Sequence, residues 1–274
     1  RDLRMSRGLG DVYKRQVFVP KKNALDTLQK RETKAKETGK MTEEQLAKQK
    51  ANGSESDDTI CTADLTDDEI LEGLNLLLIG DSIAVDVTDD FYEMFPNSVS
   101  DTKIGRITSL GKQVLDSYID EKKWEGEGVI FASLSNSPIN GELEDIREKI
   151  GKDMPLFLTT VRIPHDTFEE ESNSKIKKFV EENDHTYLID WYAASEGHDE
   201  YFDADDTHLL PAGAKAYAKC IKEAVVAAYK KENIEIPKSR LSSGADTSTD
   251  SSNASSTDSN TDSSNDNRTD TSTE

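Results

Sequence analysis

The middle of the chain alternates between short apolar runs and longer segments in which apolar residues recur every three or four positions. A short apolar run is typical of a strand covered on both faces, and the three-to-four spacing is typical of an amphipathic helix. The pattern predicts five strands, at residues 74–79, 98–104, 128–133, 156–161 and 186–190. It predicts helices at residues 89–95, 109–123, 141–150, 169–183 and 211–231.

Regular alternation of strands and helices predicts an α/β fold, a three-layer α/β/α arrangement with a five-stranded parallel sheet. Binding and catalytic residues of such sheets lie beyond the carboxyl ends of the strands. Ser82, Gly105 and Asn136 follow the first, second and third predicted strands. We therefore expect these three residues at one edge of the sheet.

The sequence divides into four segments. Residues 1–16 resemble translated sequencing-adapter sequence, an artefact of sequencing or assembly, and take no part in the fold prediction. Residues 17–65 are polar and basic, with a helical pattern over 25–50, and are interpreted as a linker or stalk. Residues 66–236 form the predicted catalytic domain. Residues 237–274, rich in Ser, Thr and Asp, have too few apolar residues to form a core and are predicted to be disordered.

Charge is distributed unevenly over a chain whose net charge is −21. Residues 1–52 contain 14 Lys and Arg and 7 Asp and Glu, whereas residues 241–274 contain 1 Arg and 7 acidic residues. The body between them therefore carries a charge of −22, and it would repel the phosphates of a nucleic acid. No apolar stretch of about 20 residues is present to span a bilayer. Residues 17–22, an apolar run followed by two lysines, are interpreted as a trace of a preceding membrane helix.

Three residues suggest nucleophilic chemistry. Ser82 follows a predicted buried strand directly, and Asp205 and His208 come about 120 residues later. A serine hydroxyl needs a base, and histidine is the side chain whose ordinary pKa lies near neutral pH. Asp205, three residues before His208, can hold one ring nitrogen while the other faces Ser82. Each motif alone has a structural explanation: Gly-Asp-Ser occurs in surface turns, and Asp-x-x-His occurs at helix caps. Together the two motifs predict hydrolytic or acyl-transfer chemistry.

Two stretches resemble a known family. Gly80-Asp81-Ser82-Ile83 resembles the first block of the SGNH (GDSL-type) hydrolases, and Asp205-Asp206-Thr207-His208-Leu209 resembles their last block. Further stretches resemble the extracytoplasmic SGNH domain of acyltransferase-3 type peptidoglycan O-acetyltransferases: Ile104-Gly105-Arg106, Ser135-Asn136-Ser137-Pro138, Val161-Arg162-Ile163-Pro164, Ile189-Asp190-Trp191-Tyr192-Ala193 and Leu209-Leu210-Pro211-Ala212-Gly213. The resemblance covers residues 74–230, and its specificity lies in the order of the blocks.

The resemblance implies a flavodoxin-like fold, Ser82 as nucleophile, His208 as base and Asp205 as the residue that orients it. It implies an oxyanion hole from the amides of Ser82 and Gly105 and the side chain of Asn136. The sequence departs from the family pattern at Leu134 and Ser137, where the family carries glycine.

The implied activity is transfer of an acetyl group, through an ester on Ser82, to a hydroxyl of a cell-wall glycan, with esterase side activity. The alternatives are a carbohydrate esterase or lipase-like hydrolase of the same fold, and a non-catalytic wall-binding module. The resemblance further implies an extracytoplasmic location, tethering to the membrane, and acetyl delivery by a membrane acyltransferase domain, here a missing N-terminal part. We expect no metal and no cofactor.

Some assignments stay open at this stage. Arg106, Trp191 and Tyr192 are candidates for substrate binding, although we favour the structural alternatives, a salt bridge for Arg106 and aromatic packing for Trp191 and Tyr192. Cys61 and Cys220 are compatible either with one disulfide or with two free thiols.

Overall fold

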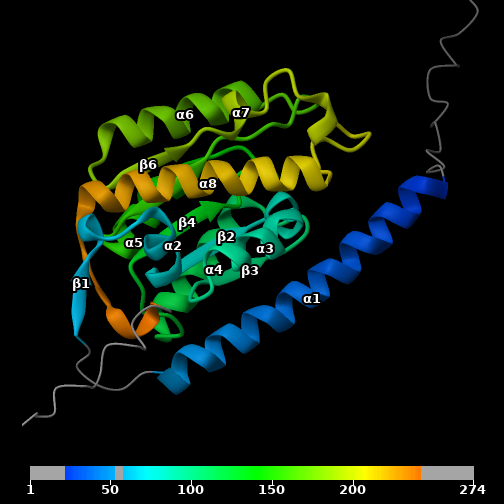
Figure 1. Ribbon diagram of the computed structural model, residues 1–274. Helices are drawn as coiled ribbons and strands as arrows, with labels where there is room; N and C mark the ends of the chain where they lie inside the picture. Colours follow the sequence, from blue (N-terminus) through cyan, green and yellow to red (C-terminus); the bar gives the residue numbers. More distant parts are fainter. Residues whose placement is uncertain (1–21, 53–57, 242–274) are drawn as a thin grey trace, which may run out of the picture.

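A computed structural model describes residues 22–52 and 58–241, and Figure 1 shows its layered architecture. Its centre is a five-stranded parallel sheet in the order β3-β2-β4-β5-β6. The strands are β2 (Leu76–Gly80), β3 (Val99–Thr102), β4 (Gly128–Ala132), β5 (Leu156–Thr159) and β6 (Thr186–Ile189). Relative to chain order this is the 2-1-3-4-5 arrangement of flavodoxin-like folds. The predicted fold class is confirmed.

Helices cover both faces of the sheet. One face packs against α2 (Asp67–Gly73), α3 (Ser82–Met94) and α8 (Pro211–Glu232). The other packs against α4 (Thr108–Asp120), α5 (Glu142–Ile150) and α6 (Glu169–Glu182). The alternation within β2 shows how the two cores arise: Leu76 and Leu78 belong to the first, and Leu77 and Ile79 to the second. Because both faces are covered, the whole strand is apolar.

The helix after β2 begins earlier than its predicted bounds. We predicted it at 89–95, but α3 starts at Ser82. Its first two turns are buried on all sides, and the buried residues include the polar Ser82, Asp86 and Thr88, so the sequence shows no division into an exposed polar face and a buried apolar face. The first strand of the sheet was predicted at 74–79, but β2 begins at Leu76, because Leu74 is the C-terminal cap of α2.

The structure also contains short elements that the apolar pattern did not predict. β1 (Thr59–Cys61) and β7 (Glu235–Pro237) form an antiparallel pair, with Ile60 opposite Ile236. Three 3₁₀-helices, η1 (Thr62–Asp64), η2 (Asp199–Tyr201) and η3 (Lys238–Arg240), and α7 (Trp191–Ala194) complete the described elements. Cys61 and Cys220 are free thiols in the structure.

The C-terminal boundary at residue 237 needs correction. Residues 237–241 were placed in the tail, yet Pro237 pairs with Thr59 and Leu241 is buried in the core. The buried Leu241 side chain and the bonds from Arg240 to the Gly73 carbonyl and to Glu127 fix this segment, although the sequence around it is polar. The rest of the predicted tail, 242–274, and the predicted artefact, 1–16, lie outside the described residues.

The segment interpreted as a linker contains one long helix, α1 (Lys22–Asn52), which lies along the edge of the body beside β3 and α3 (Figure 1). The Thr42 hydroxyl donates to the backbone carbonyl of Ser100 in β3. Gln49 Nε2 donates to Asn75 Oδ1 at 2.8 Å and to the Asn97 carbonyl at 3.1 Å. These polar contacts explain why a helix with few apolar positions packs here. Neither α1 nor any other helix in 22–52 and 58–241 has both the length and the apolarity to cross a bilayer.

Candidate active site

A tight turn joins β2 to α3 and carries Ser82. Asp81 is the N-cap of α3, and its side chain accepts a hydrogen bond from the Ile83 amide. A Cβ added at Gly80 would lie 2.2 Å from the Ala84 Cβ, so only glycine lets the first turn of the helix approach the strand this closely. Ser82 is 6% exposed at the start of the helix. The turn therefore holds the hydroxyl in one position at the carboxyl edge of the sheet.

His208 reaches this serine from a loop between η2 and α8. The Ser82 hydroxyl lies 2.9 Å from His208 Nε2, and His208 Nδ1 lies 2.7 Å from Asp205 Oδ2. With Nδ1 donating to the carboxylate, Nε2 is free to accept the serine proton. The three side chains that we predicted as nucleophile, base and orienting acid therefore lie in one hydrogen-bonded row.

Asp205 is held by several donors at once. Besides the ring of His208, the backbone amides of His208 and Thr207 donate to Asp205 Oδ1 at 3.0 and 3.2 Å. The hydrogen bond from the His208 side chain, helped by these amides, lowers the pKa of Asp205 well below its ordinary value. The carboxylate thus stays ionised, which suits a group that must stabilise a positively charged imidazole.

The predicted oxyanion-hole residues lie on the strands that flank β2. Gly80 pairs with Thr102 of β3 on one side and with Ala132 of β4 on the other. Gly105 and Asn136 follow those partners by three and four residues, so they share the edge that carries Ser82. Gly105 has φ +68° in the turn after β3, a left-handed conformation that suits glycine. The exposed Asn136 amide donates to Ser135 Oγ at 3.3 Å.

Asp81 was quoted only as part of a motif, but the structure gives it a clear task. Its Oδ1 accepts from the Ile83 amide at 3.0 Å, and its Oδ2 accepts from the amide and the hydroxyl of Ser135. Burial raises the pKa of Asp81, and the hydrogen bonds from Ser135 and Ile83 partly oppose that effect. Asp81 joins the nucleophile turn to the loop that carries Asn136. The signal for this role in the sequence was an aspartate directly after an apolar strand and before the nucleophile.

Arg106 does not face a substrate. Its side chain is 5% exposed, and its guanidinium donates to the Gly80 carbonyl at 3.1 Å and to Asp101 Oδ1 at 2.5 Å. The structure therefore corrects the substrate-binding candidate in favour of the salt bridge: Arg106 braces the ends of β2 and β3.

Trp191 lies among other aromatic rings. It is 2% exposed and packs against the rings of Tyr201, Phe202 and Tyr217. Its buried ring also lines the pocket beside the nucleophile turn, so a substrate-binding role for Trp191 stays a prediction. Tyr192 is half-buried, and the Arg162 guanidinium lies 5.1 Å from the centre of its ring. Of the three candidates, only Tyr192 keeps an exposed part.

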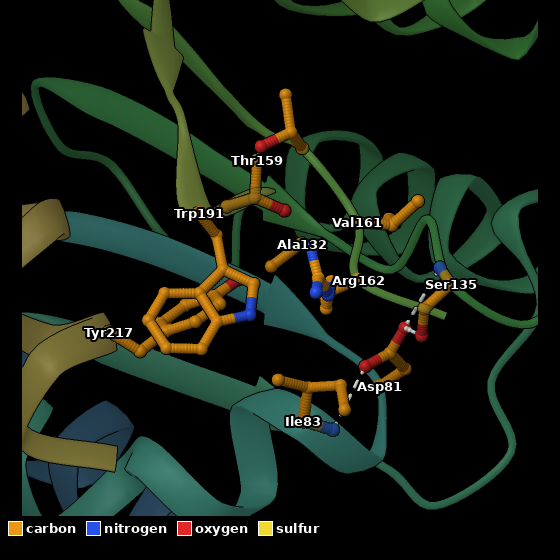
Figure 2. Close-up of a pocket in the computed structure, with 10 residues that line it drawn as sticks. Asp81, Ile83, Ala132, Ser135, Thr159, Val161, Arg162, Trp191 and Tyr217 are labelled. Carbon is orange, nitrogen blue, oxygen red and sulfur yellow. Dashed lines mark hydrogen bonds between the residues drawn. The ribbon is translucent and has the colours of Figure 1, made fainter. Parts of the chain in front are cut away.

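A pocket adjoins the nucleophile turn, with an empty volume of about 260 Å³ (Figure 2). Asp81 and Ile83, the residues on either side of Ser82, line it, and Figure 2 shows the bonds from Asp81 to Ile83 and Ser135. The remaining wall comes from the ends of β4 and β5, the loop after β5, α7 and α8: Ala132, Ser135, Thr159, Thr160, Val161, Arg162, Trp191 and Tyr217. We did not predict this pocket, because its wall comes from five separate parts of the chain.

The residues that replace glycine in the family pattern have structural partners. Leu134 is fully buried, and Ser137 Oγ accepts from the Thr108 amide at 3.2 Å. Both contacts fix the loop after β4 against α4. Within the described residues no group of three or more His, Cys, Asp or Glu side chains is arranged as a metal site.

Comparison with known proteins identifies relatives of part of the chain. No family model matches it. The O-acetyltransferase OatA of Staphylococcus aureus is 34% identical over 146 residues, which are 53% of this chain and 24% of that protein. The chain therefore spans about a quarter of the length of the curated relatives that it matches.

Comparison with solved structures finds one that shares the fold. The C-terminal catalytic domain of Streptococcus pneumoniae peptidoglycan O-acetyltransferase A, solved with a methylsulfonyl adduct, has a TM-score of 0.53 and 20% identity, covering 60% of this chain and 98% of that one. A GDSL-like lipase from Bacteroides thetaiotaomicron has a TM-score of 0.47 and 16% identity, covering 61% of this chain and 94% of that one. Part of this chain is therefore similar in sequence to OatA, and it shares the fold of the C-terminal catalytic domain of the S. pneumoniae O-acetyltransferase.

Proposed function

We propose that this chain is a serine-dependent O-acetyltransferase that transfers acetyl, through an ester on Ser82, to a hydroxyl of a cell-wall glycan. The observation that carries the proposal is the hydrogen-bonded row from Ser82 through His208 to Asp205, at 2.9 and 2.7 Å. The similarity to O-acetyltransferases supports acetyl as the group and peptidoglycan as the acceptor.

In the first half-reaction, His208 Nε2 takes the hydroxyl proton of Ser82 while the oxygen attacks the carbonyl carbon of the acetyl donor. The carbonyl π bond opens and leaves an oxyanion, which the amides of Ser82 and Gly105 and the Asn136 side chain would stabilise. When the carbonyl re-forms, the bond to the leaving group breaks and His208 returns the proton to it. The ionised Asp205 stabilises the imidazolium throughout.

The second half-reaction repeats these steps with a glycan hydroxyl. His208 accepts the hydroxyl proton as the oxygen attacks the acetyl-Ser82 ester, and it protonates Ser82 when the ester bond breaks. Water can replace the glycan, which makes acetylesterase activity the expected side reaction. Acetyl is a small acyl group, and the enclosed part of the pocket beside the nucleophile turn has room for only about one water-sized group, which favours a short acyl chain.

The proposal includes the surroundings of the domain. We place it outside the cytoplasm, tethered to the membrane, with acetyl relayed from a membrane acyltransferase domain. The support is the resemblance of residues 74–230 to domains with that organisation and the sequence similarity to OatA.

The test uses the full chain and an aryl acetate, with and without a chito-oligosaccharide. We expect ester hydrolysis by the wild type, and acetylated sugar when the acceptor is present. Ser82→Ala and His208→Ala should lower kcat by about 10⁴-fold or more, because the members of such a triad act as a unit. Ser174→Ala, an exposed serine on α6, is the matched control and should leave kcat unchanged.

A covalent probe checks the nucleophile separately. A sulfonyl fluoride should modify Ser82, located by peptide mass spectrometry, and Ser82→Ala should abolish the modification. Hydrolysis without acetylated sugar would favour the carbohydrate esterase. Equal inertness of wild type and Ser82→Ala in both assays would reject the enzyme and leave the wall-binding module.

A further inference from the structure

The segment that carries His208 is a short closed loop, residues 203–208, named here the His208 loop. Phe202 and Leu209 form an antiparallel bridge at its base. The Asp203 amide donates to the His208 carbonyl at 2.8 Å, and the Leu210 amide donates to the Tyr201 carbonyl at 2.8 Å. The position of the imidazole therefore depends on what holds this base against the rest of the site.

Asp86 attaches the base of the loop to the helix of the nucleophile. Its Oδ2 accepts from the Leu209 amide at 3.1 Å, directly beside His208. Asp86 lies four residues after Ser82 in α3, so the two side chains share one helix face. The Asp86 side chain is 9% exposed, and burial raises its pKa, an effect that the charge of Arg31 opposes. A buried carboxylate in this position requires a cation beside it.

Arg31 on α1 supplies that cation and links Asp86 on α3 to Asp203 at the start of the loop. Its Nε lies 3.6 Å from Asp86 Oδ1, and its Nη2 donates to Asp203 Oδ2 at 3.3 Å. The Arg31 side chain is 11% exposed. One turn further, Lys34 Nζ donates to the Asp86 carbonyl at 2.9 Å and pairs with Asp89 at 3.1 Å. Figure 1 shows α1 running past α3, the helix that carries these partners.

We infer that Arg31 is a positioning residue: it clamps the His208 loop to α3, so that the Ser82–His208 pair depends on the docking of α1. The inference rests on the proposed function for its catalytic consequence. It extends the active unit beyond residues 74–230, where the family resemblance lies, and it gives a segment interpreted as a linker a direct part in the site.

The experiment compares four single variants and one double variant of the full chain. Arg31→Ala removes the clamp, and Arg31→Lys keeps its positive charge. Asp203→Asn weakens the contact between Arg31 and the loop but leaves Arg31 in place beside Asp86. Lys36→Ala, an exposed lysine five residues along the same helix, removes the same charge without touching the loop. Circular dichroism and thermal unfolding verify that each variant folds. Steady-state kinetics with the aryl acetate and hydrogen exchange of peptides covering 202–210 are then measured.

Arg31→Ala should lower kcat by about 10- to 100-fold with KM changed less than about twofold, because a shift of about 1 Å in a catalytic group has effects of this size. Exchange at 202–210 should rise, while exchange in β4 and β5 stays at the wild-type rate. Arg31→Lys should recover part of kcat, and Lys36→Ala should match the wild type. The double variant of Arg31→Ala with Asp203→Asn should lose less than the product of the single losses.

Wild-type kcat and wild-type exchange in Arg31→Ala would overturn the inference. A fall in thermal stability with unchanged kcat below the transition would also overturn it, since that result assigns Arg31 to stability alone. If the wild type itself hydrolyses no ester, the proposed function fails. The hydrogen-exchange measurement then tests the clamp without any catalytic readout. Equal exchange at 202–210 in Arg31→Ala and Lys36→Ala would show that Arg31 does not hold the loop.

Discussion

At the scale of single residues, the candidate site contains two carboxylates that differ in burial and in the direction of their pKa shift. Asp205 is half exposed, and the hydrogen bond from His208 lowers its pKa; Asp81 is fully buried, and burial raises its pKa. The first suits a group that stays ionised beside the base. The second joins two backbone turns, which is a structural task.

The Asp205 pairing should give stability a defined pH dependence. A carboxylate whose pKa is lower in the folded than in the unfolded state stabilises the fold above its unfolded pKa, about 3.9, and that contribution disappears as the pH falls toward the folded pKa. We therefore expect wild type to be more stable than Asp205→Asn at neutral pH, with a gap that closes below about pH 4. Urea unfolding across this range measures it. A gap that grows below pH 4 would contradict the assignment.

At the scale of elements, the site is assembled where β2, β3 and β4 end and where the loop before α8 returns. The strand-helix alternation predicted the sheet edge and the positions of Ser82, Gly105 and Asn136 on it. It missed the first two turns of α3 and the packing of α1. The start of α3 buries polar residues as well as apolar ones, and in α1 polar contacts take the place of an apolar stripe.

The start of α8 sets the base of the His208 loop, and Gly213 makes this possible. A Cβ at Gly213 would lie 2.2 Å from the Tyr201 carbonyl oxygen, which also accepts from the Leu210 amide. Gly213→Ala should therefore cost about 1–3 kcal/mol, as overpacking does, and lower kcat.

The matched control is Gly39→Ala in α1, where an added Cβ meets nothing within 4 Å. Because alanine favours helix over glycine, this variant should gain up to about 1 kcal/mol and keep wild-type kcat. Urea unfolding and aryl-acetate kinetics measure both variants. Equal stability of Gly213→Ala and wild type would show that the α8 start can move freely.

At the scale of the whole molecule, charge opposes the proposed acceptor. The chain carries a net charge of −21, and a cell-wall polymer rich in carboxylates would be repelled by its acidic body. Salt screens such repulsion, with a Debye length of about 10 Å at 0.1 M.

We therefore expect the transfer rate to an anionic glycan polymer to rise with ionic strength, while hydrolysis of a neutral aryl acetate stays constant. A neutral chito-oligosaccharide is the matched acceptor control. A rate that falls with salt for the anionic polymer alone would point to a cationic acceptor site, and the whole-molecule charge would not control encounter.

The sequence by itself determined the fold class, because strand and helix periodicities are local and five alternations leave little choice of architecture. It also identified Ser82, Asp205 and His208, because each has a short-range signature, a strand-ending glycine turn or a three-residue spacing. Only the tertiary structure decided the tasks of Arg106, Asp81 and Arg31. Each of these depends on which distant segment lies against the side chain, and burial and charge pairing across the fold leave no periodic trace in the sequence.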